Sequence, residues 1–75
     1  MEIYEFIKIA KNYGYRFKEC FMNTLIFMNE RKKIISIDLD NHNCWVTTPE
    51  RYNEVFTLND LKMISEIYKI HNWIN

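Results

Sequence analysis

The chain opens with a helical pattern of apolar positions. Five apolar side chains follow the i, i+3, i+4, i+7 spacing of one helix face. They are Ile3, Phe6, Ile7, Ala10 and Tyr13. Gly14, the only glycine, comes next, where a helix commonly ends in a left-handed residue. The pattern predicts a helix that begins near Glu2 and stops at Gly14.

From residue 15 to residue 48 the pattern becomes extended and is rich in β-branched and aromatic residues. It predicts strands over residues 15–21, 24–29, 33–39 and 44–48. The connections between them are short, and short connections join antiparallel neighbours. We therefore expect an antiparallel meander. The first strand is the least regular, because residues 20–23 fit either a bulge or a loop.

A second helix closes the chain. Thr57 is a suitable N-cap, and Asp60 follows three positions later, a spacing related to the capping box. Residues 48–56, which precede this helix, form either a short helical turn or a loop. The order of elements predicts a single α+β domain over residues 1–75, with an N-terminal and a C-terminal helix on a three- to four-stranded antiparallel sheet.

The closing helix has more apolar surface than one packed face needs. Its apolar residues form two stripes about 100° apart, which together span about 180° instead of the usual 100° or so. One stripe consists of Leu61, Ile64, Tyr68 and His71, and the other of Met63, Ile67, Ile70 and Ile74, with Trp73 nearby. Either the helix lies in a groove between the first helix and the sheet, or the second stripe contacts a second copy of the chain or a protein partner. Tyr4 and Ile9, which lie off the core face of the first helix, favour an interface.

Trp45 is the second candidate for a contact. If Cys44 and Val46 face the helices, strand alternation directs Trp45 and Thr47 to the opposite face of the sheet. Ile34 and Ile35 alternate in the same way. A sheet face without helices must be polar or covered. An exposed Trp45 would therefore indicate a docking surface.

The formal net charge is zero, from 10 basic and 10 acidic residues, but it is unevenly distributed. Residues 1–37 carry seven Lys or Arg and four Glu, about +3, and residues 38–75 carry three basic and six acidic residues, about −3. Dedicated DNA-binding proteins have a strong basic excess. The balance therefore fits neither such a protein nor an acidic mimic of DNA.

A basic turn supplies the alternative function. Arg31, Lys32 and Lys33 form the densest basic run, and Arg16 and Lys18 lie on the first predicted strand. With nearby aromatic residues they could line a sheet surface for single-stranded nucleic acid. Those aromatics are Tyr15, Phe17, Phe21 and Phe27. The other interpretation is a solvated turn above core aromatics.

The segment "IDLDNHNC" places Asp38, Asp40, His42 and Cys44 at every second position, as in a metal site on a strand. Residues 41–43, however, have turn composition, so the common direction is lost at His42. We expect a turn at a strand end and no metal. Cys20 with His42 or His71 has no oxyanion-binding loop beside it. We expect no catalytic residue, no cofactor and no enzyme.

The start of the chain lacks a basic segment followed by an apolar run, and no apolar run is long enough to cross a membrane. This indicates a cytoplasmic protein whose two cysteines remain reduced, with no membrane contact. The abundance of Ile, Asn and Lys is typical of an AT-rich genome.

The segments "IYEFIKIAKNYGYRF" and "NTLIFMNERKKIISI" resemble the small anti-CRISPR inhibitors carried by phages of low-GC bacteria. The matching positions are Ile3, Phe6, Ile7, Lys8, Lys11, Asn12, Tyr15, Leu25, Ile26, Ile34 and Ile35. The resemblance implies a phage or prophage protein that inhibits or regulates a host protein by docking. The best-known members of that shape block a DNA-binding groove with acidic residues, whereas this chain is neutral. The resemblance therefore leaves the target of the protein open.

Overall fold

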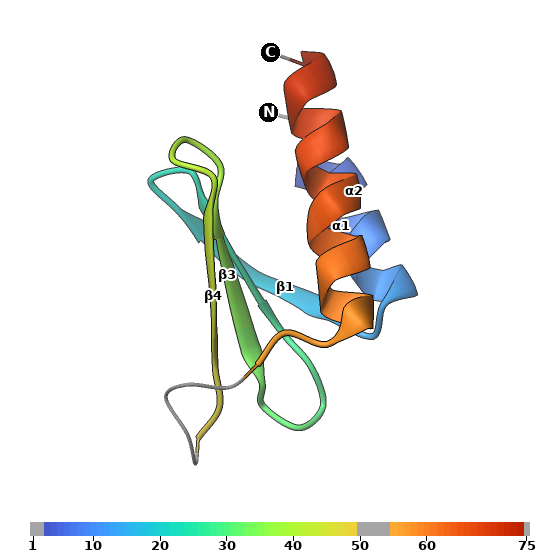
Figure 1. Cartoon of the computed structure of the whole chain (residues 1–75), viewed down its shortest axis with the longest axis vertical. Coiled ribbons are helices and arrows are strands. Elements are labelled where there is room, and N and C mark those ends of the chain that lie inside the picture. The colour runs from blue at the N-terminus through green and yellow to red at the C-terminus, as the bar shows by residue number, and fades with distance from the viewer. Residues whose placement is uncertain (1–2, 50–54, 75) are drawn as a thin grey trace.

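The fold is a helix, four strands and a second helix, as expected for the α+β class. A computed structural model describes residues 3–49 and 55–74, with side chains as far as Asn72. The elements are α1 (Ile3–Asn12), β1 (Arg16–Phe21), β2 (Thr24–Met28), β3 (Ile34–Asp38), β4 (Asn43–Thr47) and α2 (Leu58–Ile74) (Figure 1). The predicted fold class is confirmed. Residues 50–54, between β4 and α2, lie outside the described residues.

The four strands form one antiparallel sheet in the order β1-β2-β3-β4, which confirms the meander. The first strand is complete to Phe21, and its irregularity is a bulge between Phe17 and Glu19. Met22 and Asn23 then close the first hairpin with φ values of 48° and 65°. Positive φ at both central residues is the geometry of a turn that matches the twist of the two strands.

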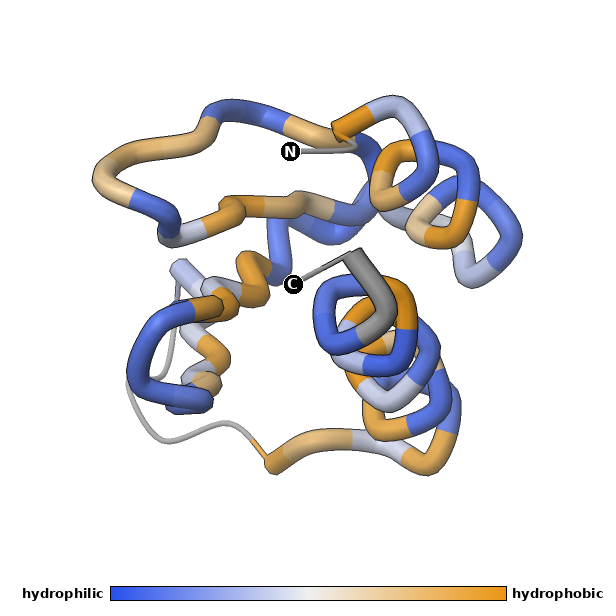
Figure 2. Tube along the Cα trace, turned by 90° about the horizontal axis from the view of Figure 1, so that it is seen from above, coloured by the Kyte–Doolittle hydropathy of each residue, from blue (hydrophilic) through white to orange (hydrophobic). Residues whose placement is uncertain are grey.

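Both helices lie on the same side of the sheet, which we call the inner face (Figures 1 and 2). Successive side chains of a strand point to opposite faces, so only alternate strand residues reach the helices. The residues of the core that come from the strands are Leu25, Phe27, Ile35, Ile37 and Val46. Those from the helices are Phe6, Ile9, Ala10, Met63, Ile64 and Ile67. Neither of the two described helices lies on the opposite side of the sheet, the outer face.

Gly14 ends α1 as the sequence predicts. Its φ is +83°, and the amide of Gly14 donates to the carbonyl of Lys11 at 3.1 Å. The amide of Tyr15 donates to the carbonyl of Ala10 at 2.9 Å. This pair of bonds satisfies the last carbonyl groups of the helix. It also reverses the chain, so that Tyr15 enters the core ahead of β1.

The apolar arc of α2 is covered mainly by the protein's own chain. Met63 and Ile67 are fully buried and Ile64 is 7% exposed, because α2 packs beside α1 on the same face of the sheet (Figure 2). Tyr68 and Ile70 are half-buried against the same core. The predicted interface through Met63 and Ile67 is therefore wrong, and a homodimer through this stripe loses its basis. The predictions for Trp73 and Ile74 fall on side chains outside the described residues.

The first helix needs a similar correction. Ile9 was expected off the core face, but it is only 9% exposed. It lies on the flank of α1 that packs against α2, as does Tyr13, which interacts with Glu66. Tyr4 remains 80% exposed, as expected.

Replacement of Gly14 by alanine tests the helix end. The variant Gly14→Ala should unfold with a free energy lower by about 1–2 kcal/mol, the cost of left-handed backbone for a residue with Cβ. No atom lies within 4 Å of the added Cβ, so backbone strain alone causes the loss. The measurement is urea unfolding, with Gly14→Asn as the control because asparagine tolerates this conformation better. Equal losses for the two variants would contradict the assignment.

Candidate interaction surfaces

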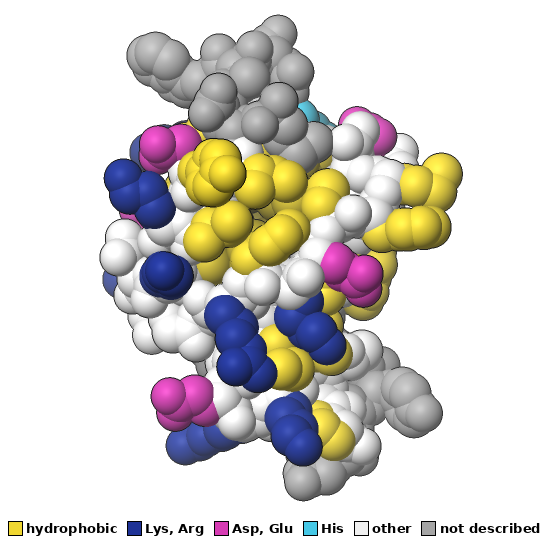
Figure 3. Space-filling model, turned by 180° about the vertical axis from the view of Figure 1, so that it is seen from behind, with side chains coloured by type: hydrophobic (Ala, Val, Ile, Leu, Met, Phe, Trp, Pro, Cys, Tyr) yellow, Lys and Arg dark blue, Asp and Glu magenta, His cyan; other side chains and the backbone are white. Residues whose placement is uncertain are grey.

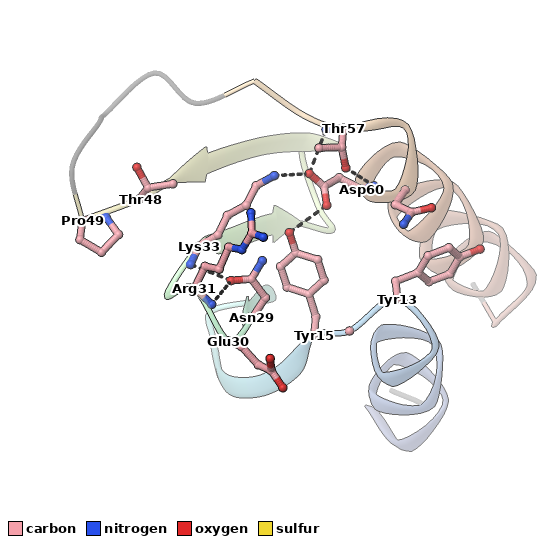
Figure 4. A pocket seen from close by; sticks show the side chains of 12 residues that line it. Tyr13, Tyr15, Asn29, Glu30, Arg31, Lys33, Thr48, Pro49, Thr57 and Asp60 are labelled. Atoms are coloured by element: carbon pink, nitrogen blue, oxygen red, sulfur yellow. Dashed lines mark hydrogen bonds and ion pairs between the residues drawn. The ribbon is translucent and has the colours of Figure 1, made fainter.

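Asp60 joins three parts of the chain at the start of α2 (Figure 4). Its carboxylate accepts hydrogen bonds from the Tyr15 hydroxyl at 2.8 Å and from the Lys33 ammonium at 2.6 Å. It also accepts one from the backbone amide of Thr57 at 2.9 Å, and the amide of Asp60 donates to Thr57 Oγ1 at 3.1 Å. The predicted capping box is confirmed. Because Tyr15 precedes β1 and Lys33 precedes β3, this junction fixes α2 on the sheet.

The electrostatics of this junction keep Asp60 and Tyr15 each in one protonation state at neutral pH. Burial acts to raise the pKa of the Asp60 carboxyl, but bonds from Lys33, Thr57 and Tyr15 outweigh it and lower the pKa. Burial also raises the pKa of Tyr15. Asp60 is therefore ionised and Tyr15 protonated at neutral pH. Neither group is poised to exchange a proton in a reaction near pH 7.

An open hollow of about 790 Å³ lies beside the junction. Asn29, Arg31, Thr48 and Asn59 contribute to its wall, and the first three are labelled in Figure 4. Its described lining contains neither histidine nor cysteine. The acid at its base is already bonded to Lys33 and Tyr15. A second acid, Glu30, also lines the hollow. The hollow therefore offers shape and hydrogen-bonding groups.

The basic residues predicted for nucleic acid do not share a surface. Lys33 is directed into the Asp60 junction, where its side chain is 13% exposed. Arg16 pairs with Met28 on the outer face, and Lys18 lies in the bulge of β1. Arg31 and Lys32 stay exposed in the loop between β2 and β3. Five basic side chains thus split among at least three places.

The aromatic residues that should have stacked on bases are mostly inside. Phe27 is fully buried and Tyr15 is 5% exposed. Phe17 packs edge-to-face on Phe27 with the ring centres 5.9 Å apart, on the inner face. Of the four aromatics, Phe21 alone is strongly exposed, at 65%. The interpretation as core aromatics beneath a solvated turn describes these residues better.

The segment from Asp38 to Cys44 is a strand, a turn and a strand, as predicted. Asp38 Oδ1 accepts from the amides of Asp40 and Asn41 at 3.0 and 3.2 Å, and Oδ2 accepts from Asn41 Nδ2 at 2.9 Å. The Asn41 side chain is the main cause of a lowered pKa at Asp38. His42, with φ +58°, stacks on Tyr68 at 5.0 Å between ring centres. Among the residues described, no three His, Cys, Asp or Glu side chains could hold a metal ion together.

The two cysteines cannot bond to each other in this fold. The register Cys20, Leu25, Ile37, Cys44 runs across all four strands. Three strand spacings separate their Cα atoms by about 14 Å, whereas a disulfide needs less than about 7 Å. Cys44 Sγ lies 3.2 Å from the Tyr68 hydroxyl oxygen, and burial raises the pKa of its thiol. Cys44 is therefore a partly buried thiol whose surroundings disfavour the thiolate form.

The outer face of the sheet is apolar at its centre. Trp45 is 46% exposed there while Val46 is 5% exposed on the other side, which confirms the alternation predicted for β4. The register places Ile26, Ser36 and Trp45 in one row across three strands. Met28 and Ile34 form the next row. Ser36 is 7% exposed although neither described helix covers this face.

The sequence-based prediction placed Trp45 and Thr47 at this face, left open which of Ile34 and Ile35 joins them, and missed Ile26 and Met28. The signal was present in β2, where "TLIFM" is apolar at four of five positions instead of alternating. Such a strand is apolar toward both faces. The outer face is thus a continuous apolar surface of four side chains on three strands.

Comparison of this chain with protein families, curated proteins and solved structures finds no match. None of the helices described is both long and apolar enough to cross a membrane.

Asp60→Asn tests the junction. The variant leaves the Lys33 charge without its partner, so the free energy of unfolding at pH 7 should fall by about 3–5 kcal/mol. Replacing Lys33 by methionine in the same chain should restore part of the loss, since the unpaired charge is then removed. The measurement is urea unfolding, with Glu19→Gln on the exposed part of β1 as the control. A loss no larger than that of Glu19→Gln would contradict the assignment.

The same variant gives a pH dependence. The pKa of Asp60 is lowered on folding from its ordinary 3.8, so its stabilising effect is complete above that value and is lost as the pH falls through the folded-state pKa. The difference between the native chain and Asp60→Asn should therefore narrow below about pH 4. A difference that stays constant from pH 7 to pH 3 would contradict the lowered pKa.

Proposed function

We propose that the protein is a non-enzymatic binding module that docks on another protein through the outer face of its sheet. The observation that carries this proposal is the row of Ile26, Ser36 and Trp45 beside Met28 and Ile34, on a face without a helix. The outer face of an antiparallel sheet is ordinarily polar when it faces water. Contiguous apolar surface on a small domain marks an interaction site.

A protein partner fits this surface better than a nucleic acid does. Trp45 is the single aromatic residue at the centre of the outer face, and Arg16 lies at its margin. Binding of single strands needs several stacking aromatics along a basic groove. Here Phe17 and Phe27 face inward, and Lys33 is paired with Asp60. A neutral apolar face rimmed by polar groups has the composition of a protein interface.

The resemblance to anti-CRISPR inhibitors supports a partner class. On this proposal the chain is encoded by a phage or prophage and inhibits a host defence or regulatory protein. Because the chain is neutral, it would act by docking on protein surface and not by imitating DNA. We place this activity in the cytoplasm, which accords with two cysteines that cannot pair within the chain. Inhibition of DNA cleavage by purified RNA-guided nucleases tests the class.

Site-specific photo-crosslinking tests the surface. A photoreactive phenylalanine analogue at position 45 should give covalent adducts with one protein in the cells that produce the chain, because the outer face would lie against it. The same analogue at position 61 is the control, since Leu61 is 50% exposed on α2. Equal adducts from both positions, or none from position 45, would contradict a specific contact through this face.

The partner identified in this way then allows a quantitative test. Trp45→Ala should weaken binding by about 30-fold or more, since a central interface tryptophan usually contributes at least about 2 kcal/mol. Leu61→Ala should leave the affinity within about twofold, because single exposed apolar residues outside an interface contribute little. Calorimetry measures both, and thermal unfolding verifies that each variant is folded. An unchanged affinity of Trp45→Ala would contradict the proposal.

A further inference from the structure

The edge strand β1 differs from the rest of the sheet in its exposure. It pairs with β2 alone, so one row of its backbone amides and carbonyls has no strand beside it. Five of its six side chains are exposed, whereas the other edge strand, β4, has two exposed. Exposed strand edges are templates for pairing with another extended chain. The edge of β1 is therefore open along most of its length.

A hollow between α1 and β1 adds apolar contacts to this edge. Tyr13 interacts with Glu66 of α2, and Ile9, four residues earlier, shares that flank of α1. Ile3 and Ile7 lie about 80–160° further around the helix, on the flank away from α2, and α1 also contacts β1. Ile3 and Ile7 are both half-buried. Cys20 shares the inner face with its partner Leu25, yet Cys20 is exposed. No helix therefore covers the inner face at this end of β1.

The surface view agrees with this description. Seen from behind, hydrophobic side chains gather over the junction of α1 with the first hairpin, and Lys and Arg side chains gather beside them (Figure 3). At the far end of the strand, Phe21 is 65% and Met22 is 81% exposed. The pairing of Phe21 with Thr24 places Phe21 on the outer face, so the hairpin tip does not line this hollow. The edge of β1 and the flank of α1 form an apolar channel, which we call the α1–β1 groove.

The charge around the α1–β1 groove is basic. Between residues 3 and 21 the chain carries Lys8, Lys11, Arg16 and Lys18 against Glu5 and Glu19, a net +2 in a chain whose total is zero. The bulge leaves Lys18 without a cross-strand partner. A lysine on an edge strand opposes pairing with basic or neutral strands. The same positive charge attracts an acidic strand.

We propose that the α1–β1 groove binds an extended acidic segment of a partner protein, which adds to β1 as a fifth strand. Its backbone bonds to the open row of β1, and its alternate side chains divide between two environments. Apolar side chains enter the channel beside Ile7 and Cys20 on the inner face, and acidic ones point to the other side of the edge, near Arg16 on the outer face and Lys18 in the bulge. This surface is separate from Trp45, which lies on the fourth strand and the opposite face.

Fluorescence anisotropy with a labelled octapeptide, in which valine alternates with glutamate, tests this inference. The peptide should bind saturably, and its analogue with lysine in place of glutamate should bind about tenfold or more weakly, because like charges would then meet. Lys18→Glu should weaken binding of the acidic peptide, whereas Lys69→Glu on α2 should not. Absence of saturable binding, or equal effects of the two charge reversals, overturns the proposal.

Backbone methylation of the peptide tests strand addition itself. Methyl groups on alternate amides remove the hydrogen bonds along one side of an extended chain and leave the other side intact. One frame of methylation should abolish binding and the other should preserve it. Equal effects of both methylation frames overturn the proposal that the peptide adds as a fifth strand. Tighter binding of a single-stranded oligonucleotide than of the acidic peptide also overturns it, as does a dimer of the free protein in sedimentation. Trp45→Ala should leave peptide binding unchanged, so this result is independent of the proposed function.

Discussion

Asp60 determines where the second helix lies. Its carboxylate caps α2 through Thr57 and bonds to Tyr15 and Lys33, which stand at the entrances to β1 and β3. With its first turn held there, α2 runs along the inner face and places Met63 and Ile67 in the core. Both helices are then on one side of a four-stranded sheet. Among the elements that the structure describes, none is left to cover the outer face.

That asymmetry is what gives the protein two different surfaces. On the outer face, apolar residues of β2, β3 and β4 form a flat surface centred on Ser36 and Trp45. At the opposite edge, β1 extends past the cover that α1 provides and leaves Cys20 exposed. The first surface is neutral and suits a folded protein. The second is basic and has unpaired backbone, which suits an extended chain.

Local features were predictable from the sequence because each depends on residues close together in the chain. Gly14 ends α1, Thr57 caps α2, and strict alternation places Trp45 opposite Val46. The apolar arc of α2 was harder, since periodicity gives its width but not what covers it. Ile9 turned out to be part of that cover.

The positions of the basic residues 31–33 in the fold could not be predicted in the same way. Lys33 and Asp60 are 27 positions apart, and nothing local to either residue indicates the pair. Because Lys33 is paired with Asp60, its charge is not available to a nucleic acid. The bulge of β1 has a similar origin, because a register shift depends on the facing strand as much as on the bulged one.

The most direct measurement of the central claim is methyl NMR of the protein with and without its partner, in the presence of a soluble paramagnetic probe. In the free protein, the methyl signals of Ile26, Met28 and Ile34 should broaden, while those of Met63 and Ile67 in the core stay sharp. In the complex, the three outer-face signals should become protected. Protection that appears elsewhere while these three remain exposed would contradict docking through the outer face.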